Sequence, residues 1–250
     1  MTLPDIALYF AVAAAGSAIN SVAGGGTFIV FPVLIFNGLS ALQANIMSTI
    51  ALWPGSISSA AAYRSQLEIE KRRLAGFMAI STLGSAIGTA VLLLTPEKTF
   101  SHLVPWLLLG ATLIFTFGRR FPAVFQSRLG EKGKLAAYAL QFLIAIYGGY
   151  FGAGIGILML AMLQIMGLEH IHRMNALKAV LGGTINAVAV IIFICSGRVI
   201  WSLGAVMIAG AVTGGWLGAK LALRISPRFV RFAISATGGA MTAYFFLHGV

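Results

Sequence analysis

The chain has 250 residues, of which 59% are hydrophobic and 9% are charged, and its formal net charge is +11. A soluble domain carries about 25% charged residues, so lipid must be the solvent for most of the folded surface. The positive charge does not indicate a nucleic-acid partner, because the basic residues lie in short loops between apolar runs, where they act as topology signals. The composition excludes a soluble domain and predicts an all-α integral membrane protein that sits in the lipid bilayer.

Ten apolar segments follow one another along the chain, which predicts about 8–10 membrane crossings. They cover residues 5–23, 25–37, 41–62, 74–94, 100–118, 134–151, 154–167, 174–196, 200–223 and 229–248. The second and the seventh segment are too short to cross about 30 Å of hydrocarbon at 1.5 Å per residue. Each follows a glycine cluster, and glycine weakens a helix. Each short segment therefore predicts a broken helix or a re-entrant hairpin, although two full spans remain an alternative.

An internal repeat is found when the chain is compared with itself at an offset of 130 residues. The offset superposes Gly24 on Gly154, Gly26 on Gly156, Asn45 on Asn175, Ser56 on Asn186, Gly84 on Gly214 and Gly88 on Gly218. Single glycine matches arise by chance, but a shared offset predicts a duplication. We expect two transmembrane repeats, residues 1–125 and 126–250, within one membrane domain.

The basic loops orient these repeats in the membrane. Most basic residues fall in the loops at 63–73, 119–134 and 220–231, with Arg173 before the eighth segment. The positive-inside rule places these loops in the cytoplasm and leaves Lys98 and Arg198 outside. Equivalent loops of the two halves then lie on opposite sides, so the sequence predicts inverted repeats with both termini outside. Inverted repeats that meet at broken helices are the architecture of secondary transporters.

The first glycine break is a candidate binding site for an anion. Gly24, Gly25 and Gly26 are flanked by Asn20, Ser21 and Thr27. If the second segment begins near Thr27, its first N–H groups point at the break and suit an oxyanion. Close helix packing is the alternative for these glycines, and it is the preferred interpretation for Gly84, Gly88, Gly214 and Gly218.

Lys178 is the strongest single indication of an anion site in the second half. A lysine inside a span usually faces the bundle interior or a cavity, because exposure to lipid is costly. The alternative is that its amine reaches the cytoplasmic interface, since Arg173 is near. Other residues at repeat-related positions complete the candidate substrate site. They are the polar residues Asn45, Ser48, Asn175 and Asn186 and the glycines Gly154 and Gly156.

The acidic residues all lie at segment ends or in loops, so no carboxylate is expected at membrane depth. Such a cavity favours an anion over a cation. The sequence shows no metal-ligand cluster, catalytic triad or phosphate-binding loop, so we expect neither an enzyme nor a bound cofactor or metal.

The stretch from Asn20 to Thr27, with Pro32 after it, resembles the first-half signature of the sulfite exporter TauE/SafE family. The second half is similar to the pattern of that family through Asn175-Ala176-Leu177-Lys178, through Asn186 and through the run from Ser196 to Trp201. The likeness covers essentially the whole chain.

The resemblance implies a multi-pass permease of the bacterial inner (plasma) membrane that exports sulfite or an organosulfonate. This agrees with the anion preference inferred from Lys178. The alternatives are a passive anion channel and an importer of a different small organic anion. The coupling ion is open, and so is the oligomeric state, for which a homodimer is one option.

Overall fold

The computed structural model describes residues 2–67, 69–117, 132–168, 170–221 and 227–249. These residues form ten α-helices and one short 3-10 helix, and none of them forms a strand, so the predicted all-α fold is confirmed. The helices are α1 (Leu3–Ala23), α2 (Thr27–Phe36), α3 (Ala41–Ala62), η1 (Arg64–Gln66), α4 (Lys71–Leu94), α5 (Glu97–Phe117), α7 (Lys132–Tyr150), α8 (Ile155–Ile165), α9 (Ile171–Cys195), α10 (Trp201–Leu221) and α11 (Pro227–His248). Each α-helix begins within three residues of the start of the segment that the sequence predicts.

Among the residues that the structure describes, four helices are long and apolar enough by themselves to cross a membrane. They are Leu3–Val22, Lys71–Leu94, Ile171–Cys195 and Trp201–Lys220. The short helices α2 and α8 have 10 and 11 residues, which corresponds to about 15 Å each. They reach only about half of the hydrocarbon thickness. Each is the short arm of a hairpin whose long arm is the preceding helix, which decides between the hairpin and the two full spans.

The helices of the second half repeat those of the first. The helices α3, α4 and α5 begin at Ala41, Lys71 and Glu97, and α9, α10 and α11 each begin 130 residues later. The short helices α2 and α8 begin 128 residues apart, so their offset differs by two residues from that of the long helices.

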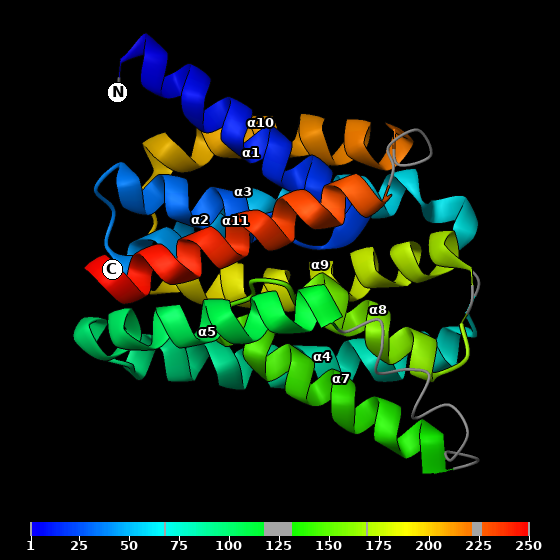
Figure 1. Ribbon diagram of the computed structural model, residues 1–250. Coiled ribbons are helices and arrows are strands. Elements are labelled where there is room, and N and C mark those ends of the chain that lie inside the picture. The colour runs from blue at the N-terminus through cyan, green and yellow to red at the C-terminus, as the bar shows by residue number, and fades with distance from the viewer. Residues whose placement is uncertain (1, 68, 118–131, 169, 222–226, 250) are drawn as a thin grey trace.

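Corresponding helices run in opposite directions. Figure 1 shows that α1, α3 and α5 run from left to right, whereas α7, α9 and α11 run from right to left. The helices α4 and α10 are likewise opposed (Figure 1). These directions support the predicted inverted repeat. The predicted boundary between residues 125 and 126 lies outside the described residues.

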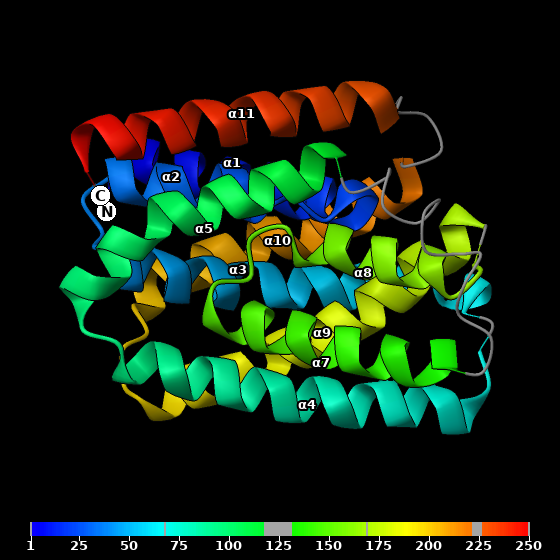
Figure 2. The same ribbon diagram turned by 60° about the horizontal axis from the view of Figure 1, so that its bottom comes forward.

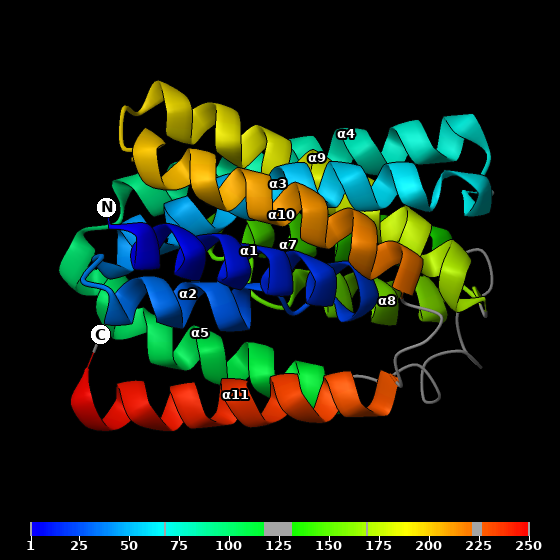
Figure 3. The same ribbon diagram turned by 90° about the horizontal axis from the view of Figure 1, so that it is seen from above.

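One helix of each half packs mainly on helices of the other half. The second-half helix α10 lies along α1 and α3, and the first-half helix α4 lies along α7 and α9 (Figures 2 and 3). Glycine permits both contacts: a Cβ on Gly88 would overlap the Ile146 carbonyl, and one on Gly214 would overlap the Ala14 carbonyl. The close-packing interpretation of these glycines is confirmed. The helices α5 and α11 pack on each other beside the two groups (Figure 3).

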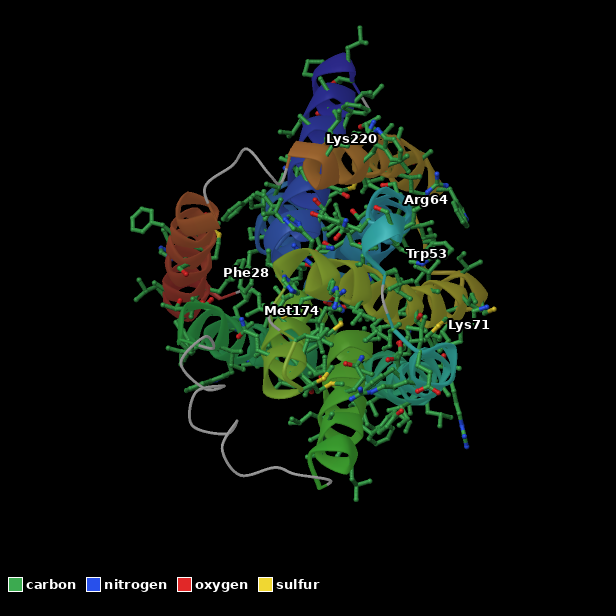
Figure 4. All side chains as sticks on the ribbon, turned by 90° about the vertical axis from the view of Figure 1, so that its right-hand side faces the viewer. Phe28, Trp53, Arg64, Lys71, Met174 and Lys220 are labelled. Carbon is green, nitrogen blue, oxygen red and sulfur yellow. The ribbon has the colours of Figure 1, made fainter. Side chains whose placement is uncertain are left out.

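Basic side chains gather at one end of the bundle. Figure 4 looks along the helices at this end and labels Arg64, Lys71 and Lys220 there. Helix α1 begins and α11 ends at the opposite end (Figure 1). Lys98 lies in the first turn of α5 and Arg198 lies in the connection between α9 and α10, and both are at that opposite end. We refer to the end with Arg64, Lys71 and Lys220 as the basic end.

Candidate functional site

The two helix breaks meet inside the bundle. Helix α1 ends at Gly24, whose φ of 81° is the left-handed conformation that favours glycine and whose N–H bonds back to Asn20 and Ile19. In the second half, Gly152 and Gly154 have φ values of 77° and 75°. A Cβ on Gly24 would lie 2.6 Å from the Cα of Gly156. The breaks of the two repeats therefore touch backbone to backbone, which only glycine allows.

Each break exposes the start of a short helix. Helix α2 begins at Thr27, as predicted, and its first backbone bond runs from the Phe28 N–H to the Gly25 carbonyl at 3.2 Å. Helix α8 begins at Ile155, and the Ile157 N–H bonds to the Gly154 carbonyl at 3.0 Å. The N–H groups at such helix starts have no partner within the helix and carry partial positive charge.

Lys178 connects the second repeat to the break of the first. Its side chain is only 4% exposed, so the alternative in which its amine reaches the cytoplasmic interface is wrong. The Nζ atom donates to the carbonyls of Asn20 and Ser21 at 3.1 and 3.0 Å. These carbonyls belong to the last turn of α1, where a helix carries partial negative charge and favours a cation. An ammonium group has three donors, and one is left for another partner.

A polar cavity lies beside Lys178. Its volume is about 350 Å³, and this volume includes space that is open to solvent. Its lining residues come from α1, α3, α8 and α9, and they are Asn20, Ser21, Ser56, Ser59, Ile155, Gly156, Met159, Lys178, Ala179, Gly182 and Asn186. No carboxylate is among these residues.

The cavity lies in the half of the bundle nearer the basic end. Ser59 lies three residues before the end of α3, and Lys178 lies seven residues after the start of α9, and both of these helix ends are at the basic end. Beyond the breaks, aromatic side chains fill the bundle. Phe31 and Phe151 make an edge-to-face contact at 5.6 Å, and Phe100 makes another with Tyr150 at 5.8 Å.

The structure brings five of the residues predicted from the sequence together around this cavity. They are Asn20, Ser21, Gly156, Lys178 and Asn186. The other predicted residues do not line it. Gly24, Gly25, Gly26, Thr27 and Gly154 form the breaks themselves, and Asn45, Ser48 and Asn175 are buried on α3 and α9. Their roles in binding remain predictions.

Sequence reasoning missed five lining residues, namely Ser59, Ile155, Met159, Ala179 and Gly182. Ile155 and Ala179 are neighbours in sequence of Gly156 and Lys178, and Ser59, Met159 and Gly182 lie one helical turn from Ser56, Gly156 and Lys178. Residues three or four positions apart share one face of a helix. Extending each identified position by one turn would therefore have found Ser59, Met159 and Gly182.

The fold and the cavity define a class of protein: a helical, multi-pass membrane transporter whose repeats meet at broken helices around a buried polar site. The chain belongs to the sulfite exporter TauE/SafE family, whose profile it matches over residues 8–245. This membership points to transport and not to catalysis.

Relatives resemble the chain over nearly its whole length. A probable membrane transporter protein of Haemophilus influenzae is 27% identical over 246 residues, which is 95% of this chain and 93% of the relative. The probable membrane transporter protein YfcA of Escherichia coli K12 is 26% identical over 95% of this chain and 88% of its own. A probable membrane transporter protein from Sinorhizobium, ORF9, is 25% identical over 90% of this chain and 86% of its own. No solved structure matches.

Proposed function

We propose that the chain is a secondary transporter of the bacterial inner membrane that carries sulfite or a related organosulfonate. The observation that carries the proposal is a buried ammonium group in a cavity whose lining residues include no carboxylate. A buried charge without an opposite charge beside it is costly, and a bound anion would supply that opposite charge. The family name gives the sulfur oxyanion as the substrate class.

The lining offers donors to an oxyanion from several directions. Lys178 keeps one N–H beyond the two that bind α1, and Gly156 lies in the first turn of α8, where the partial positive charge of the helix start favours an anion. Asn20 and Asn186, whose side-chain amides can donate, also line the cavity. A small oxyanion can accept several such bonds at once, and bonds to a charged group are the stronger ones.

The two-sided architecture supports alternating access. The cavity lies in the half of the bundle nearer the basic end, which the positive-inside rule places in the cytoplasm, and the aromatic contacts lie beyond the breaks. We expect an anion to reach this conformation from the cytoplasm, which is the direction of export. Rearrangement around the meeting point of the two glycine breaks would then open the opposite side.

The test is sulfite transport by the purified protein in proteoliposomes. We expect saturable uptake of radiolabelled sulfite, competed by organosulfonates such as taurine and accelerated by unlabelled sulfite on the opposite side. The acceleration distinguishes a carrier from a passive channel, because exchange through a channel shows no such counterflow. An absence of flux from folded, inserted protein above that of empty liposomes would overturn the sulfite assignment.

A further inference from the structure

The helices α3 and α9 are joined by a hydrogen bond between equivalent positions of the repeat. The indole Nε1 atom of Trp53 on α3 donates to the carbonyl of Gly183 on α9 at 3.1 Å, and the two residues are 130 positions apart. The same offset relates the starts of the two helices. In inverted repeats, which are related by a pseudo-two-fold axis, a contact between equivalent positions lies at that axis. Trp53 and Gly183 therefore mark the place where the two halves cross.

Helix α9 has two adjacent glycines at this contact that packing does not require. A Cβ on Gly183 would meet no atom within 4 Å, and one on Gly182 would meet only the Met159 Cε atom at 3.6 Å, an ordinary van der Waals distance. Alanine would thus fit at both positions, unlike at Gly156. Glycine weakens a helix relative to alanine, because it leaves the backbone free to adopt other conformations. Backbone freedom, and not space, is the property that glycine supplies here.

Both helices are weakened again at the residue after this contact. Pro54, which follows Trp53 in α3, has no N–H, so the helical bond to the carbonyl four residues earlier is missing. Thr184, which follows Gly183 in α9, bonds through its hydroxyl to the Val180 carbonyl at 3.0 Å. Such bonding to the preceding turn often bends a helix. The weak points of α3 and α9 therefore fall at equivalent positions.

The weak point of α9 divides the lining of the cavity. Lys178 lies one turn before Gly182, Asn186 lies one turn after it, and all three line the cavity. A bend at the two glycines would move the part of α9 that carries Lys178 relative to the part that carries Asn186. The bend would therefore change the shape of the cavity without unfolding either part of the helix.

We propose that Gly182 and Gly183 are a hinge of α9, that the bond from Trp53 holds this hinge in its present conformation, and that bending there changes the access to the cavity. Hinges absorb large backbone changes at a few positions, which are often small residues. The inference rests on the proposed function, because a carrier needs two access states.

The first measurement is sulfite uptake by proteoliposomes that contain Gly183→Ala. Alanine fits the present helix and restricts the backbone, so we expect the maximum rate to fall about two- to fivefold, the effect of one such substitution on a conformational equilibrium. The affinity for sulfite should not fall, because Gly183 is not among the residues that line the cavity. Gly110→Ala on α5 is the matched control, because a Cβ there also meets no atom within 4 Å. It should leave both the rate and the affinity unchanged.

The second measurement is hydrogen exchange of the backbone amides of residues 183–190 in the absence of sulfite, which does not depend on transport. Local opening of a helix sets the exchange rate of its amides. We expect Gly183→Ala to slow this exchange and Trp53→Phe to accelerate it, because phenylalanine keeps a ring but removes the donor. The amides of α4 are the internal reference, which separates a local change from a change in global stability.

A maximum rate of sulfite uptake in Gly183→Ala equal to that of Gly110→Ala would overturn the hinge and leave the transport function standing. If the wild-type protein shows no sulfite flux, the proposed function is contradicted and hydrogen exchange decides the hinge by itself. Opposite changes in Gly183→Ala and Trp53→Phe would then support it, and equal exchange in both variants and the wild type would overturn it.

Discussion

At the scale of single residues, Lys178 combines a structural contact with a proposed role in binding. It bonds to the carbonyls of Asn20 and Ser21, about 157 positions earlier in the chain, and it also lines the cavity. The ammonium group therefore compensates the end of α1 and places positive charge where the anion is proposed to bind. The two roles are separable, because one affects stability in the absence of ligand and the other affects affinity.

Replacing Lys178 with methionine keeps most of the side-chain volume and removes the charge. We expect sulfite affinity to fall about tenfold or more, since a hydrogen bond to a charged group contributes roughly 1.5–3 kcal/mol. The unfolding temperature should also fall, because the carbonyls of Asn20 and Ser21 lose the hydrogen bonds that Lys178 donates. Uptake kinetics and thermal unfolding measure the two effects.

The matched control is Lys220→Met. Lys220 is an exposed lysine that stacks over the Trp216 ring at 4.4 Å near the end of α10. It should leave sulfite affinity unchanged. An affinity for Lys178→Met equal to that of the control would contradict the role of Lys178 in binding.

At the scale of elements, the breaks depend on glycine for two different reasons. Gly24 needs its positive φ to end α1, whereas Gly156 needs the absence of a side chain because the two breaks are in contact. The pairs Gly84 with Gly88 and Gly214 with Gly218 serve the packing of long helices and are not among the residues that line the cavity. The same residue type thus forms a turn, a crossing point and a packing surface in one chain.

The variant Gly156→Ala tests the crossing point. A Cβ at Gly156 would overlap the Gly24 backbone, and such overpacking typically costs 1–3 kcal/mol, so we expect a clear fall of roughly that size in the free energy of unfolding. Thermal or denaturant unfolding in detergent measures it.

Gly183→Ala is the matched control on α9, because a Cβ there meets no atom within 4 Å. It should be neutral or stabilising by about 0.5–1 kcal/mol, as alanine is the better helix former. A Gly156→Ala protein as stable as this control would show that the breaks are not in close contact.

At the scale of the whole molecule, the packing groups the helices differently from the chain order. The helix α10 lies on α1 and α3, and α4 lies on α7 and α9, so each group contains a helix from the opposite half. A rocking of one sequence half against the other would have to separate both of these contacts. Movement of the mixed groups keeps them, and it also keeps the glycine-mediated contacts intact.

The predicted orientation is tested by two reporter cysteines in a Cys195→Ser background, since the native cysteine is exposed. Ser65 lies in η1 at the basic end, and Ser202 lies in the first turn of α10 at the opposite end, and both are exposed. In spheroplasts, a membrane-impermeant maleimide should label Ser202→Cys and should reach Ser65→Cys only after permeabilisation. The reverse pattern would invert the topology and place the cavity nearer the outside.

The sequence by itself determined the elements of this protein. Hydropathy and glycine act locally along the chain, so the positions of the ten helices and the two breaks followed from runs of neighbouring residues. The 130-residue offset also makes Asn45 equivalent to Asn175, and Ser48 equivalent to Lys178, without any knowledge of the contacts. Asn20, Ser21, Lys178 and Asn186 were found because polar residues within apolar runs are unusual, and Gly156 was found as the repeat partner of Gly26.

Only the tertiary structure decided which of these residues meet. The contact between Lys178 and the end of α1, the contact between Gly24 and Gly156, and the exchange of α4 and α10 join residues far apart in the chain. Such contacts depend on how whole helices pack, and no local pattern specifies them. The same packing decides that Gly156 lines the cavity whereas Gly24, Gly25 and Gly26 do not.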